Sequence, residues 1–211
     1  MVEFAVNALT RQTLAGLRMI LVMTVLVGIA YPLAVWAVAH LPGLSAHAEG
    51  SVITAPDGTA TGSSLIGVDP VAKDPAADPY FHTRPSATAK DILGPGDPST
   101  SAASNQAGDS EKLLKAVNDR RAAIAAREGV NPAAVPPDAV TASASSVDPH
   151  ISAAYAELQA ARVARVTGVP AADVARLVAE HTDGRALGVL GAPGVNVTEL
   201  NLAIARAAHG R

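Results

Sequence analysis

The most apolar stretch of the chain lies near its N-terminus, where no formally charged residue occurs between Met19 and Ala39. At a rise of about 1.5 Å per residue, roughly 20 such residues cross a hydrocarbon core about 30 Å thick. The pattern predicts a transmembrane helix over residues 15–40, starting near Leu14, with Arg18 reaching back toward the lipid headgroups. Pro32 lies inside this stretch, where a membrane helix tolerates it with a kink.

A cleaved signal peptide is the main alternative, because Ala46-His47-Ala48 fits a small-x-small cleavage site. The apolar core of a signal peptide spans about 7–15 residues and this stretch is longer, so a retained anchor is favoured. A buried soluble helix is disfavoured, because helices that are apolar on every face at this length are rare outside membranes. A secreted hydrolase would require cleavage near Ala48.

Positive charge flanks the predicted anchor on one side only. Arg11 and Arg18 precede it, and no Lys or Arg follows until Lys73. Because cytoplasmic flanks carry the excess of Lys and Arg, we expect residues 1–14 in the cytoplasm and residues 41–211 outside it, as one soluble domain.

The soluble part changes pattern along its length. Residues 42–108 are dense in Gly, Pro, Ser, Thr and Asp, which favour turns and short strands, and we expect strands at 63–68 and at 80–85. Helical periodicity follows. Three helices are predicted: from a cap at Asp109 or Ser110 to Gly129, from Ser152 to Thr167-Gly168, and from Pro170 at the first position to a stop at Asp183-Gly184. Residues 195–208 fit a strand or a short helix. The predicted fold class is α+β: a single N-terminal transmembrane helix followed by one small soluble α+β domain.

Composition narrows the possible chemistry. The net charge of −3 gives no reason to expect a nucleic-acid partner, and the absence of cysteine excludes disulfides, thiolate metal sites and cysteine nucleophiles. Aromatic residues make up only 3%, so the core must be built from Leu, Ile and Val.

Three sets of polar residues could carry chemistry. Asp148, His150, His181 and Asp183 have ligand types suited to a divalent metal, but their spacing matches no known ligand pattern, and Asp and His at helix ends commonly bond free backbone groups. Ser143, Ser145 and Ser146 lie near His150 without a G-x-S-x-G elbow. We therefore expect neither a metal nor a catalytic residue.

Gln159 and Arg162 are three apart on a predicted helix and so share one face. The amide and the planar guanidinium suit a carboxylate or phosphate partner. From spacing alone, a solvated helix face is the favoured interpretation.

Eight segments in order carry a family resemblance. They are YPL at 31–33, GSSLIG at 62–67, YFHTRPSA at 80–87, VTAS at 140–143, DPHIS at 148–152, QAARVA at 159–164, HTDGRALG at 181–188 and VNV at 195–197. Together they resemble the C subunit of bacterial potassium-transporting P-type ATPases, the KdpC family, over nearly the whole chain. The loops SAASNQAG at 101–108 and SASS at 143–146, and Gly194 in place of an Arg, depart from the family pattern.

The resemblance implies a non-catalytic accessory subunit in the bacterial inner membrane. Its partners would be a channel-like potassium-binding subunit and a P-type subunit that hydrolyses ATP. Together these subunits would bind and transport K⁺. The family is described as a catalytic chaperone that raises ATP affinity, which would make ATP a ligand and Gln159, Arg162, Asp148 and His150 nucleotide or partner contacts. A stand-alone, membrane-tethered ligand-binding protein is the alternative.

The expected topology conflicts with direct nucleotide contact, because cytoplasmic ATP cannot reach a domain outside the membrane. We therefore expect the domain to lie over the extracytoplasmic mouth of the channel-like subunit and to stabilise it.

Overall fold

The computed structural model describes residues 2–55 and 58–209. The outer limits of the expected domains, at 1 and 211, thus lie outside the described residues. The chain divides into two units, Met1–Ser51 and Val52–Arg211, which we take separately.

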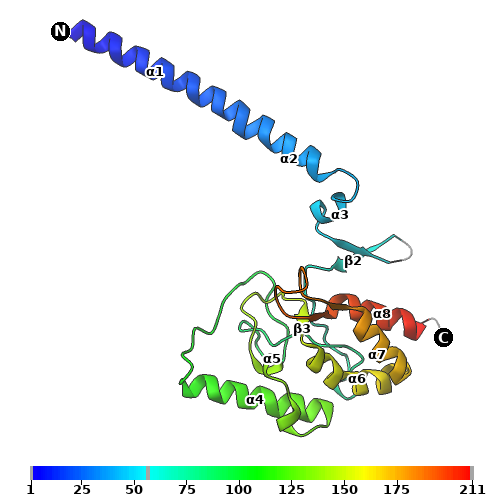
Figure 1. Cartoon of the computed structure of the whole chain (residues 1–211). Coiled ribbons are helices and arrows are strands. Elements are labelled where there is room, and N and C mark those ends of the chain that lie inside the picture. The colour runs from blue at the N-terminus through cyan, green and yellow to red at the C-terminus, as the bar shows by residue number, and fades with distance from the viewer. Residues whose placement is uncertain (1, 56–57, 210–211) are drawn as a thin grey trace. The chain divides into compact units, whose positions relative to one another are not determined.

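The first unit is dominated by one long helical segment, built from α1 (Val2–Val25), the π-helical turn η1 (Leu26–Ala30) and α2 (Tyr31–Ala39), and followed by the short α3 (Ser45–Ala48) (Figure 1). The part apolar enough to cross a membrane is Val6–Ala39, 34 residues or about 50 Å. The predicted helix start near Leu14 is wrong, because residues 2–13 contain no Gly or Pro to end a helix.

Pro32 explains the π-helical turn. It lacks an N–H, and its ring would collide with the carbonyl one turn earlier in a regular α-helix. The chain widens before it, so that the Tyr31 N–H donates to the carbonyl of Leu26, five residues back. The proline is thereby accommodated without ending the helix.

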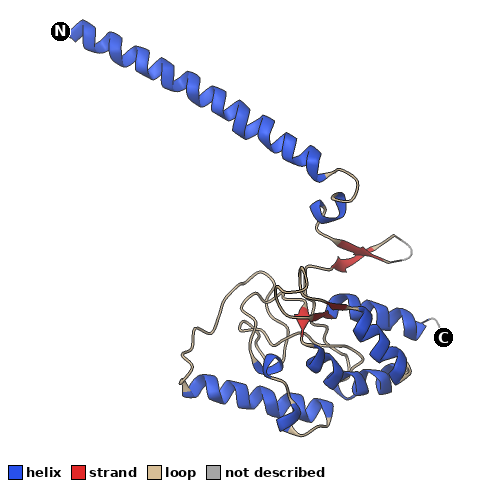
Figure 2. Cartoon of the chain, in the orientation of Figure 1, coloured by secondary structure: helices blue, strands red, loops and turns tan. Residues whose placement is uncertain are grey.

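The second unit contains two small antiparallel sheets and five α-helices within the described residues (Figure 2). One sheet pairs β1 (Val52–Thr54) with β2 (Ala60–Ser63); the other has the order β3-β5-β4, from His150–Ile151, Gly194–Asn196 and Thr182–Asp183. The helices are α4 (Glu111–Glu128), α5 (Pro137–Val140), α6 (Ala153–Thr167), α7 (Ala171–Glu180) and α8 (Val197–His209), with 3-10 turns η2 (Pro75–Ala77) and η3 (Pro132–Ala134). The predicted α+β class is confirmed.

The helix caps follow the sequence prediction closely. The Ser110 and Ser152 hydroxyls accept from the N–H groups of Leu113 and Tyr155 at the starts of α4 and α6. Gly129 and Gly168 end these helices in the left-handed conformation. The undecided segment 195–208 proves to be both elements: the end of β5 and then α8.

Some element predictions are wrong. Pro170 is the N-cap of α7 rather than its first residue, and α7 stops at Glu180 because Thr182–Asp183 pairs with β5. The strand expected at 63–68 lies at Ala60–Ser63 instead. No strand forms over 80–85, although Phe81 of this segment is fully buried in the core.

Candidate functional site: a buried polar network

Side-chain amides take the place of a neighbouring strand along residues 80–83. Asn201 accepts from the Phe81 N–H and donates to the Phe81 carbonyl, both at 2.8 Å. Gln159 does the same for His82, accepting from its N–H at 2.8 Å and donating to its carbonyl at 3.2 Å. The backbone of this buried segment is therefore satisfied without a sheet, which explains why the predicted strand is absent.

Gln159 and Arg162 do share a face of α6, as predicted, but that face is buried. Gln159 is 0% exposed and Arg162 is 3% exposed, so the solvated-face interpretation is wrong. The sequence contained a signal for this: Tyr155, Ala156 and Val163 recur at helical spacing on the same face, and all three are buried.

Arg162 is the centre of the network. Its Nη1 donates to the carbonyl oxygens of Asp78 and Tyr80 at 2.8 and 2.9 Å. Its Nε donates to the Glu128 carboxylate at 3.0 Å, and its Nη2 to the Gln159 amide oxygen at 3.2 Å. One planar fork thus ties α6 to the end of α4 and to the segment after η2, a geometry that lysine cannot reproduce.

His82 lies between two carboxylates. Its Nδ1 is 2.8 Å from Asp69 Oδ1 and its Nε2 is 2.5 Å from Asp78 Oδ2. Burial lowers the pKa of His82, but the hydrogen bonds of the ring to Asp69 and Asp78 outweigh it, so the pKa is raised above its ordinary value. Burial raises the pKa of Asp78, yet His82, the Tyr80 N–H and Arg162 together hold it below its usual value.

A second cation, Arg127, closes the network at the end of α4. Its Nε donates to Glu128 at 2.7 Å and its Nη2 to the Tyr155 hydroxyl at 3.0 Å. Glu128 thereby serves two arginines with a side chain that is 0% exposed. Across the residues that the structure describes, every buried side-chain nitrogen or oxygen has a hydrogen-bond partner. No buried polar atom of this network lacks a partner, so its role is to hold the surrounding elements together. We call it the structural lock.

Asp148 and His150 lie apart from this network, in a shallow depression of about 570 Å³. Asp148 pairs with Arg84 at 2.5 Å, and His150 Nε2 bonds Asp183 at 3.0 Å. His181, the fourth member of the candidate metal set, donates from Nδ1 to the Leu177 carbonyl at 2.8 Å. No group of three or more potential metal ligands occurs among the described side chains.

The candidate serines form hydroxyl contacts of their own. Ser146 bonds Ser86 at 2.9 Å and Thr88 at 2.7 Å, while Ser143 bonds Ser145 at 3.1 Å. His150 bonds Asp183 instead. The structure thus brings no histidine base to these hydroxyls.

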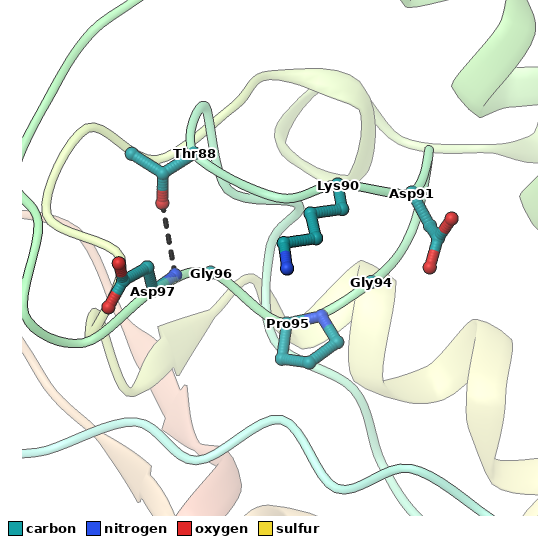
Figure 3. Close-up of a pocket in the computed structure, with 7 residues that line it drawn as sticks. All are labelled: Thr88, Lys90, Asp91, Gly94, Pro95, Gly96 and Asp97. Carbon is teal, nitrogen blue, oxygen red and sulfur yellow. Dashed lines mark hydrogen bonds between the residues drawn. The ribbon is translucent and has the colours of Figure 1, made fainter.

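A second depression, of about 330 Å³, lies over the loop from Thr88 to Asp97 (Figure 3). The Asp97 N–H donates to Thr88 Oγ1 at 3.1 Å, and a Cβ at Gly96 would collide with Ser86, so the loop packs tightly against the hydroxyl cluster. Lys90 is the cation among the lining residues, and Asp91 and Asp97 outnumber it. A lining with a net negative charge does not favour a polyphosphate.

Together, fold and site define a class: a protein with one helix able to span a membrane, followed by a small α+β domain locked by an internal polar network. Comparison with known proteins specifies the family. The family described as "K+-transporting ATPase, c chain" (KdpC) matches residues 13–206. The chain therefore belongs to the KdpC family.

Relatives in several bacteria support this assignment. The chain is 49% identical to the potassium-transporting ATPase KdpC subunit of Kineococcus radiotolerans over 207 residues, 98% of this chain and 99% of that protein. It is 46% identical to the corresponding subunit of Streptomyces avermitilis, covering 90% and 91% of the two chains. The subunit of Polaromonas naphthalenivorans is 48% identical, also over 90% and 91%.

Proposed function

We propose that this chain is a non-catalytic, membrane-anchored subunit that assembles and stabilises the channel-like and ATP-hydrolysing subunits of a Kdp potassium-uptake complex. Its N-terminal helix would anchor it in the bacterial inner membrane, with residues 1–14 in the cytoplasm, residues 15–40 spanning the bilayer, and residues 41–211 outside. The orientation is supported by Arg11 and Arg18, which precede the uncharged stretch 19–39.

The observation that carries this proposal is that the side chains of Gln159 and Arg162 are buried and bonded inside the domain. The Gln159 amide bonds His82 and Arg162, and the Arg162 guanidinium bonds Glu128 and two carbonyls. At 0% and 3% exposure, neither side chain is presented to a nucleotide at the surface. A contribution to ATP affinity, which the family resemblance implies, would then pass through the partner subunits, and Asp148 and His150 remain candidate partner contacts.

The side of the membrane tests this proposal directly, because the chain contains no cysteine and accepts single reporter thiols. Ala103→Cys lies in an exposed loop, and Asn7→Cys, exposed on α1, is the matched reporter for the other side. In intact cells expressing the complex, we expect a membrane-impermeant maleimide to label Ala103→Cys at once and Asn7→Cys only after lysis.

The reverse labelling pattern would place the domain in the cytoplasm and restore direct contact with ATP. The alternative of a stand-alone ligand-binding protein makes a different prediction. It requires the tagged chain to purify from membranes without the other Kdp subunits, whereas the proposed function requires that they purify together.

A further inference from the structure

The connection between β4 and β5 contains a small hairpin whose apolar side chains face solvent. Leu187 is 91% exposed, Val189 74% and Leu190 59%. The base of the hairpin is firmly mounted, because β5 pairs with both β3 and β4 and Val195 is fully buried. The tip therefore presents three aliphatic side chains from a fixed support.

The hairpin is held in one conformation by its own hydrogen bonds. Ala186 and Leu190 exchange two backbone bonds of 2.9 Å, and the Val189 N–H donates to the Ala186 carbonyl at 3.2 Å. The Arg185 guanidinium donates to the Gly191 carbonyl at 2.7 Å. Little conformational entropy remains to be lost when such a tip is covered.

Leu187 is an unfavourable residue for the turn of this hairpin. Leu187 has φ +53° and Gly188 φ +76°, a pair of positive angles typical of a turn that favours Asn-Gly or Asp-Gly. A leucine in this left-handed conformation is strained and, when exposed, gains nothing from burial. An exposed, strained leucine is explained by a contact that the isolated chain lacks.

The charges at the hairpin indicate what covers it. Asp183 pairs with His150 and Arg185 bonds Gly191, and residues 186–194 carry no charge. An anionic lipid surface would be matched by clustered Lys or Arg and by Trp or Tyr, which residues 183–194 lack. An uncharged, rigid tip fits an apolar pocket on another protein.

We propose that the hairpin tip formed by Leu187, Val189 and Leu190 is a docking anchor that inserts into an apolar pocket on another subunit of the Kdp complex. This inference rests on the proposed function, since it requires that such subunits assemble with the chain.

The test compares two leucine-to-asparagine variants of the full chain, co-expressed with the other Kdp subunits. Leu187→Asn places a residue suited to the positive φ at the tip. Leu114→Asn alters a leucine on α4 that is 62% exposed and serves as the matched control. The readouts are the amount of the other subunits retained by the affinity-tagged chain and the unfolding midpoint of the purified chain.

We expect Leu187→Asn to reduce retention at least about tenfold without lowering the unfolding midpoint, and Leu114→Asn to change neither. Normal retention by Leu187→Asn, with normal retention by the wild type, would overturn the docking inference and leave the proposed function intact. Loss of retention by the wild type itself would overturn the proposed function.

A single thiol at the tip separates the possible occupants. Val189→Cys carrying a polarity-sensitive dye is expected to shift its emission to the blue only in the assembled complex. A shift in vesicles that contain this chain alone would identify lipid as the occupant. A shift that tracks self-association of the purified chain would identify a second copy, and either result would overturn the inference.

Discussion

Replacing the Gln159 amide by an apolar group of similar size tests the structural lock most directly. Gln159→Leu would leave three buried groups without their partner: the N–H of His82, the carbonyl of His82 and one N–H of Arg162. Each unsatisfied buried group costs about 1–3 kcal/mol, so the low end of the range predicts a loss of roughly 3 kcal/mol. For a chain of this size, that corresponds to a fall in Tm of about 6–12 °C.

Chemical denaturation of the full chain in detergent, followed by far-UV circular dichroism, measures this loss. Trp36 lies in α2, so tryptophan fluorescence would not report on the second unit. Glu157→Leu, two residues away on the exposed face of α6, is the matched control and should stay within about 0.5 kcal/mol of the wild type. Normal stability of Gln159→Leu combined with a loss of ATP binding would refute the structural reasoning and make Gln159 a ligand contact.

Two further predictions concern the same network. Arg162→Lys should destabilise the chain by more than about 2 kcal/mol in the same denaturation assay, because one ammonium cannot bond Glu128, Gln159 and two carbonyls together. Stability equal to that of the wild type would contradict the central role of the guanidinium. The raised pKa of His82 contributes stability that is fully present below pH 6.5, the ordinary pKa of histidine, and is lost as pH rises through the raised pKa. The lowered pKa of Asp78 contributes stability that is lost as pH falls through the lowered pKa. Denaturation across pH should show both slopes, and His82→Gln should remove the alkaline one; an unchanged alkaline slope would assign it to another group.

Helices α4 and α6 could be predicted from the sequence because local chemistry determines their ends. Serine caps at 110 and 152 and glycines at 129 and 168 satisfy or release backbone groups within a few residues. The family could be predicted for a different reason, the order of eight short motifs. Both kinds of signal are local in the chain and need no knowledge of tertiary contacts.

The segment at 80–85 shows where local reasoning fails. The sequence predicts a strand here, but its backbone partners are the side chains of Gln159 and Asn201, 77 and 120 residues away in the sequence. Pairing over such distances leaves no local pattern. The ion pair of Arg162 was equally hidden, since its partner Glu128 lies on another helix.

The long-range bonds also bear on how the domain could act as a subunit. Arg162 and Gln159 fasten the segment 78–83 to α6, and Glu128 fastens α6 to α4, so these elements are held in one arrangement. A surface that is fixed before binding loses less entropy on docking than a flexible one. The buried polar network and the exposed hairpin therefore both fit a protein that acts by docking. The charged groups rigidify the domain instead of binding a ligand, and the apolar groups of the hairpin are exposed for contact with a partner.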